Sequence, residues 1–130
     1  MKRTFVAAGV LFTLSGLVLK LSAENKNYHQ DLHWLAPESA ITRPNPLAGK
    51  ADAARGGKKL FHRYCSDCHG EDGRGVGRAA NLQSADVQIE SDGILFWKIT
   101  NGNLDRGMPA FSGLPEQERW QLALYIHKMQ

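Results

Sequence analysis

The chain has 130 residues, with 16 lysines or arginines, 13 aspartates or glutamates and a formal net charge of +3. Lys2, Arg3 and Lys20 account for this excess, because residues 1–23 contain no acidic residue and residues 24–130 carry 13 basic and 13 acidic residues. The composition therefore argues against nucleic-acid binding, and the chain is long enough for one small domain only.

The first 23 residues have the organisation of an export signal. A basic pair at residues 2–3 precedes an uncharged, mostly apolar run from Phe5 to Leu19, and a small residue, Ala23, follows. We expect a signal peptide cleaved after Ala23. The alternative is an uncleaved N-terminal anchor, although the run is shorter than the roughly 20 residues that span a bilayer comfortably. Both readings predict a periplasmic or otherwise exported protein, and the second adds a membrane tether.

Residues 24–50 are predicted to form an irregular linker or an extended wrap. Prolines at positions 37, 44 and 46 prevent a long helix, and aromatic residues such as Trp34 offer apolar surface that could lie against a domain. His29 and His33 have the i, i+4 spacing of a metal-binding pair on a helix. Because this segment lacks the pattern of a stable helix, we interpret them as solvated histidines.

Residues 51–130 are expected to form the domain, and no convincing strand pattern is present in them. Three helices are predicted there, at about 51–64, 91–101 and 115–129. Gly56 and Gly57 lie inside the first, where each glycine costs up to about 1 kcal/mol relative to alanine, so another backbone is expected to come close. The long loops between the helices are rich in glycine, and such loops usually wrap something. The expected fold class is all-α.

The sequence Cys65-Ser-Asp-Cys68-His69 contains the only two cysteines of the chain and follows the first predicted helix. A thioredoxin-like dithiol would need a strand leading into the motif, and a structural zinc site usually needs four ligands. A disulfide between cysteines three residues apart would close a very small loop and stabilise little. The remaining interpretation, covalent attachment of a haem to a Cys-x-x-Cys-His motif, agrees with export and an all-α pattern.

Haem attachment assigns a role to each residue of the motif. The thiols of Cys65 and Cys68 would each form a thioether with one vinyl group of the porphyrin, and His69 would bind the iron from one face. A second axial ligand is then required. His/Met ligation is the arrangement that raises the reduction potential of electron-transfer cytochromes.

Met108 is the predicted second ligand, because it lies in a loop between Gly107 and Pro109 and has no obvious core role. Met129 lies on the apolar side of the last predicted helix, where core packing is expected. The competing ligands are histidines at positions 29, 33, 62 and 127.

Residues 50–130 resemble the class I monohaem c-type cytochromes, in particular the small bacterial periplasmic kind. The resemblance depends on "GKKLFHRYCSDCHG", "NL" at 81–82, "DGILFWKITNG", "GMPAF" and "ERWQLALYI". It implies a cytochrome c-like fold of three main helices with long loops around one covalently bound haem c. It also implies one-electron transfer between redox protein partners, with no catalytic residues.

The family resemblance also implies packing and hydrogen-bonding roles. The first and last helices of such cytochromes cross closely at a glycine, which Gly57 matches, with aromatic packing beside it, which Phe61 and Tyr125 match. A proline usually stands before "NL" and its carbonyl accepts a hydrogen bond from the ligand histidine; Ala80 occupies that position here. Candidate partners for the haem propionates, by residue type and loop position, are Trp97, Arg74, Arg78 and Arg106.

Two alternative functions remain at this stage. The chain could be the haem c subunit dedicated to a periplasmic dehydrogenase or oxidase, because "DGILFWKITNG" and "GMPAF" also occur in haem modules attached to such enzymes. It could also be a haem enzyme or gas sensor with an open sixth position on the iron. Ligation by Met108 discriminates between this second alternative and an electron carrier.

Overall fold

A computed structural model describes residues 34–129 of the chain. The predictions for residues 1–23, for His29 and His33 and for the start of the linker lie outside the described residues. The described residues contain short and long helices and no strand, apart from one isolated bridge between Asn103 and Met108. The all-α expectation is therefore confirmed.

Three longer helices correspond to those predicted: α2 (Ala51–Tyr64), α5 (Asp92–Asn101) and α6 (Glu116–Ile126). The prediction for the end of the last helix was wrong, because α6 ends before the predicted limit at residue 129 and Met129 follows it. The structure adds single turns that the sequence did not reveal: α1 (Glu38–Ile41), α3 (Ser66–His69), α4 (Ala85–Gln88) and the 3-10 helix η1 (Leu104–Arg106). A single turn is too short to show the 3.6-residue periodicity on which helix prediction depends.

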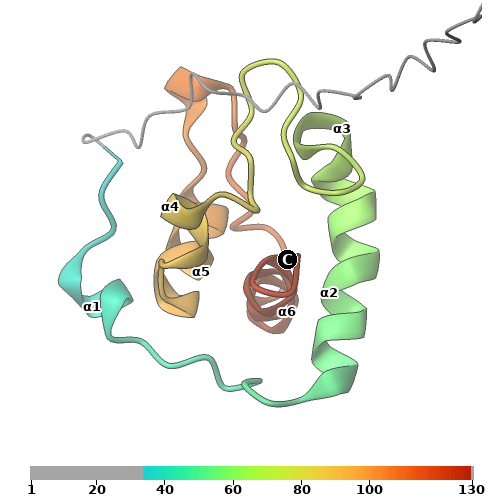
Figure 1. Ribbon diagram of the computed structural model, residues 1–130. Helices are drawn as coiled ribbons and strands as arrows, with labels where there is room; N and C mark the ends of the chain where they lie inside the picture. The colour runs from blue at the N-terminus through green and yellow to red at the C-terminus, as the bar shows by residue number, and fades with distance from the viewer. Residues whose placement is uncertain (1–33, 130) are drawn as a thin grey trace, which may run out of the picture.

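The contact between α2 and α6 is the most extensive one between helices. Figure 1 shows α6 nearly end-on between α2 and the α4–α5 pair. Gly57 is buried at the crossing, and a Cβ atom there would overlap the backbone carbonyl of Gln121 and lie 2.8 Å from the Cβ of Tyr125. Phe61 packs beside it, with its ring centroid 5.6 Å from that of Tyr125. The glycine pair was predicted to mark the close approach of another backbone, and in the structure it lies where α2 and α6 approach closely.

The opposite face of α6 packs against α5. The rings of Phe96 and Trp120 are stacked with centroids 4.0 Å apart, and Trp120 is almost completely buried. Ser91 caps α5 by accepting a hydrogen bond from the backbone N–H of Ile94, and Gly102 ends the helix with a positive φ of 63°.

Residues 34–50, which we call the N-terminal strap, lie against this helical core. The strap includes α1, which packs on α5. Asn45 is buried and its side chain donates a hydrogen bond to the backbone O of Trp120, while the Ser91 hydroxyl donates one to the backbone O of Ile41. Among the described residues, no helix has the length and apolar character needed to cross a bilayer.

Candidate cofactor site

A cavity of about 380 Å³ opens between α2, α5 and the loops that follow α3 and α5. This volume is in the range of small-molecule and cofactor sites. Most of the lining is apolar and belongs to the core of the domain: Phe61, Leu82, Val87, Leu95, Ile99, Leu122 and Ile126. The interior can therefore hold a large apolar group.

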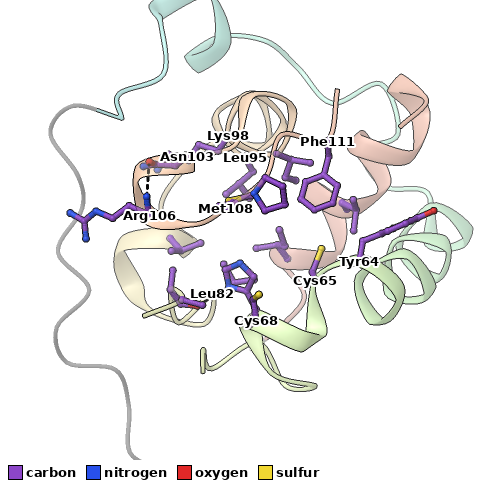
Figure 2. A pocket seen from close by; sticks show the side chains of 18 of the residues that line it. Tyr64, Cys65, Cys68, Leu82, Leu95, Lys98, Asn103, Arg106, Met108 and Phe111 are labelled. Atoms are coloured by element: carbon purple, nitrogen blue, oxygen red, sulfur yellow. Dashed lines mark hydrogen bonds between the residues drawn. The ribbon is translucent and has the colours of Figure 1, made fainter. Parts of the chain in front are cut away.

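Both cysteines line this cavity, and their positions follow from the end of α2. The backbone N–H of Cys65 donates to the O of Phe61 at 2.8 Å, which continues the helix by one residue. The N–H groups of Cys68 and His69 then donate to the O of Cys65, at 3.2 and 2.9 Å, and form the single turn α3. This turn brings the two sulfur atoms and the His69 ring to one wall of the cavity, where Figure 2 shows Cys65 and Cys68.

The environment of Cys65 differs from that of a reactive redox cysteine. Burial raises the pKa of its thiol from 9.0 to about 12, and the neighbouring Cys68 adds to the shift. Redox-active cysteines have a lowered pKa, because the thiolate is the nucleophile. In addition, no strand leads into the motif within the described residues. Both observations disfavour the dithiol interpretation.

The imidazole of His69 is held by a backbone carbonyl. Its Nδ1 lies 3.0 Å from the O of Ala80, and because a carbonyl oxygen can only accept, Nδ1 carries the proton. The neutral ring then keeps a free electron pair on Nε2 for a metal. Burial lowers the pKa of His69, partly opposed by this hydrogen bond, so the neutral form is favoured. The contact expected at position 80 is thus present although proline is replaced by alanine.

Met108 lies on the opposite side of the cavity from Cys68 (Figure 2). It is held by two backbone hydrogen bonds with Asn103, at 2.8 and 2.9 Å, which close a small loop around η1. Gly102 begins this loop and packs against the backbone of Pro109, since a Cβ atom at residue 102 would be 2.5 Å from the Pro109 carbonyl carbon. The loop therefore presents its methionine toward the cavity.

The competing axial ligands in the described residues lie elsewhere. Met129 is buried in the core, with its sulfur beside Gly73, as the packing interpretation expected. His62 pairs with Glu71, and His127 lies between the backbone O of Glu90 and the carboxylate of Asp92. Neither histidine lines the cavity. His29 and His33 are outside the described residues.

Of the four candidate propionate-binding side chains, the structure places two at the cavity and two elsewhere. Arg78 and Arg106 line the cavity, although Figure 2 shows the Arg106 side chain extending away from its centre. Trp97 instead lines a separate groove beside Arg43 and Arg119, and Arg74 pairs with Asp72.

The cavity is also lined by Trp34 and by the polar or charged residues Asp67, Glu90, Lys98 and Asn103, whose place in the cavity was not predicted from the sequence. Lys98 is the one charged residue within the apolar stretch "ILFWKI", and this isolation was the signal that could have revealed it.

The residues around the cavity fit a covalently bound haem. Two thiols, one neutral imidazole and one thioether line a single apolar cavity, and these are the groups that c-type attachment and His/Met ligation require. The described residues contain no cluster of three or more His, Cys, Asp or Glu side chains that could hold a metal ion by themselves. This donor set does not fit a structural zinc site.

Comparison with known proteins agrees with this assignment. Residues 52–126, more than half of the chain, match the family described as "Cytochrome C oxidase, cbb3-type, subunit III". One similar solved structure is the "KustC0563 c-type cytochrome", with 26% sequence identity and a TM-score of 0.51. The similarity covers 57% of this chain and 96% of that chain. No curated protein sequence matches the chain significantly.

Proposed function

This chain belongs to the c-type cytochrome family that its residues 52–126 match, and on that premise we propose that it is a one-electron carrier with His69 and Met108 as axial ligands of a single haem c. The observation that supports this proposal is the convergence of Cys65, Cys68, His69 and Met108 on one cavity. A bound haem c supplies reversible one-electron exchange between ferric and ferrous iron.

The protein's own groups would act by holding and orienting. Cys65 and Cys68 provide the two attachment points on the wall formed by α3. The Ala80 carbonyl fixes the His69 tautomer and the ring orientation, which also raises the basicity of the nitrogen that faces the metal. The Met108 thioether is a soft ligand, and His/Met ligation shifts the reduction potential upward.

We infer a carrier rather than an enzyme because both axial positions are assigned. An iron with two protein ligands has no open position for a substrate. The rival interpretation, a haem enzyme or gas sensor, requires that Met108 stays away from the iron.

A second candidate is favoured by the family description. The matched family is described as subunit III of a cbb3-type cytochrome c oxidase, so the chain is also a candidate for a haem c subunit dedicated to a larger oxidase or dehydrogenase. A dedicated subunit is expected to copurify with its partner subunits after mild detergent extraction, whereas a free carrier is recovered alone. Export, by the signal peptide or anchor proposed for residues 1–23, is expected in both cases.

The function is tested by absorption spectra of protein produced together with a haem c maturation system and isolated from the periplasmic fraction. We expect the bands of a c-type cytochrome, a far-red Fe(III)–Met charge-transfer band in the oxidised form, and slow reaction of the reduced form with CO. A colourless protein would support the dithiol alternative. Rapid CO binding without the far-red band would support an open sixth position.

A further inference from the structure

Two buried charges form one corner of the cavity. Lys98, on α5, is 7% exposed and Glu90, just before α5, is 8% exposed, and the ammonium group contacts the carboxylate oxygen Oε1. Charged side chains are rarely buried to this extent, and a buried ion pair is weak evidence for stability, since apolar residues of similar volume often serve as well. A role beyond folding is therefore worth testing for this pair.

Trp34 of the N-terminal strap covers the lysine. The Lys98 Nζ lies 4.9 Å from the centroid of the indole ring, within the range of a cation–π interaction. The indole N–H donates to the backbone O of Gly102 at 2.8 Å, so the ring is fixed at the start of the Met108 loop. Trp34 also lines the cavity itself.

This contribution comes from outside the part of the chain that matches the family. The match begins at residue 52, and Trp34 lies 18 residues earlier. The strap therefore adds to the cavity a wall that lies outside the residues of the family match.

The remaining charged groups near this corner are more exposed or belong to other pairs. Asp67, Arg78 and Arg106 line the cavity but are exposed to solvent, where their fields are screened. His127 contacts the backbone O of Glu90 and pairs through its Nδ1 with Asp92, at 2.6 Å. Among the described residues, Lys98 and Glu90 are thus the most deeply buried charges of the cavity wall.

We propose that Lys98 is a potential-setting residue for the bound haem and that Trp34 is a positioning residue that holds it there. This inference depends on the proposed function. Oxidation adds one positive charge to the cavity, and a cation on the cavity wall opposes that change most strongly where water is excluded. Lys98 therefore favours the reduced form and raises the midpoint potential, while Glu90 has the opposite effect. The indole face stabilises the ammonium group and keeps water from it.

The experiment is potentiometric titration of the purified holoprotein and its variants, with haem content checked by spectrum in each. We expect Lys98→Met to lower the midpoint potential, Glu90→Gln to raise it and Lys98→Arg to leave it nearly unchanged. Opposite signs are decisive, because a loosened, wetter cavity would shift both variants in the same direction. Lys58→Met, at an exposed position on α2, is the matched control and should shift the potential little.

Trp34 is tested by a double-mutant cycle. Trp34→Ala should lower the potential in the wild-type background and lower it less in the Lys98→Met background, because it acts through the lysine. Equal shifts in the two backgrounds would overturn the positioning role. If Lys98→Met does not accumulate as holoprotein, the role of Lys98 is decided by the two other variants: the potential should rise in Glu90→Gln and stay unchanged in Lys98→Arg.

Unchanged potentials in both charge variants, or shifts of the same sign, would overturn the role of Lys98. These outcomes are distinct from failure of the proposed function, because that failure would appear as a wild-type protein without haem or without reversible one-electron redox behaviour.

Discussion

The wall of the cavity that carries His69 and the loop that carries Met108 are held by contacts of different range along the chain. Around His69, the backbone-to-backbone hydrogen bonds are local. The N–H of Gly75 donates to the O of His69, that of Val76 to Cys68 and that of Leu82 to Gly73, at 2.7 to 2.9 Å. All of these partners lie within 20 residues of one another.

Around Met108 one supporting contact comes from much further away. The indole N–H of Trp34 donates to the O of Gly102 across 68 residues, whereas the N–H of Phe111 donates to the O of Ile99, 12 residues away, at 3.0 Å. Met108 itself is joined to Asn103 by a backbone bridge. The hydrogen bonds between backbone groups of the histidine wall are therefore local, whereas the methionine loop also depends on a contact from the N-terminal strap. Perturbations that spare attachment should still be able to release Met108.

The largest effect is expected from removing the attachment points on the histidine wall. Replacing Cys65 and Cys68 together by serine should abolish covalent binding, because no thiol remains to form a thioether. The measurement is the fraction of haem that stays with the protein after extraction with acidified organic solvent. Ser66→Ala, between the two cysteines, is the control and should keep its haem. Retained haem in the double serine variant would contradict the assignment.

A smaller effect, confined to the methionine loop, is expected from Gly102→Ala. The residue has a positive φ, and the added Cβ would meet the Pro109 backbone at 2.5 Å. Left-handed strain and overpacking together should lower the free energy of unfolding by about 3 kcal/mol. The far-red Met band should weaken at a lower temperature than the loss of helical circular dichroism.

Gly107→Ala provides the matched comparison in the same loop. Gly107 also has a positive φ, of 84°, but nothing lies within 4 Å of the added Cβ. Only the conformational strain applies, so a loss of about 1 kcal/mol is expected. Equal losses in the two variants would show that the close approach at Gly102 does not support the loop.

The smallest expected effect is a gain at the histidine wall from Ala80→Pro. The carbonyl of residue 80, rather than its N–H, contacts His69, so proline can preserve the contact while restricting the unfolded chain. A gain of about 0.5 kcal/mol in thermal or denaturant unfolding is expected. A loss of stability, or a change in the oxidised spectrum, would mean that the backbone at residue 80 cannot accept proline.

The contrast between local and long-range contacts also explains which features could be predicted from the sequence. The Cys65, Cys68 and His69 spacing and the loop glycines around Met108 are local patterns, and the structure brings these residues to one cavity. Helix α2 was predicted at its observed limits, and the unusual Gly57 was traced to a crossing with another backbone. Lys98 and Glu90, whose role depends on their positions relative to each other in the fold, were missed.

Lys98 is the clearest case of such a residue. In the sequence it stands within an apolar helix, and only the fold brings Glu90 to its ammonium group and Trp34 over it. Trp34 was recognised as apolar surface in an irregular segment, but its place in the cavity could not be inferred without the path of the strap. In contrast, Trp97 has the residue type expected near a haem but faces another groove.

The central claim, that the iron is held by His69 and Met108, is tested most directly by comparing Met108→Leu with Met129→Leu in the far-red spectrum of the oxidised holoprotein. Met129 is 6% exposed and packs in the core, so its substitution changes a similar side chain without reaching the cavity. The Fe(III)–Met band should be present in the wild type and in Met129→Leu and absent in Met108→Leu, with haem attached in all three. A band that persists in Met108→Leu, or is absent from the wild type, would contradict this ligation.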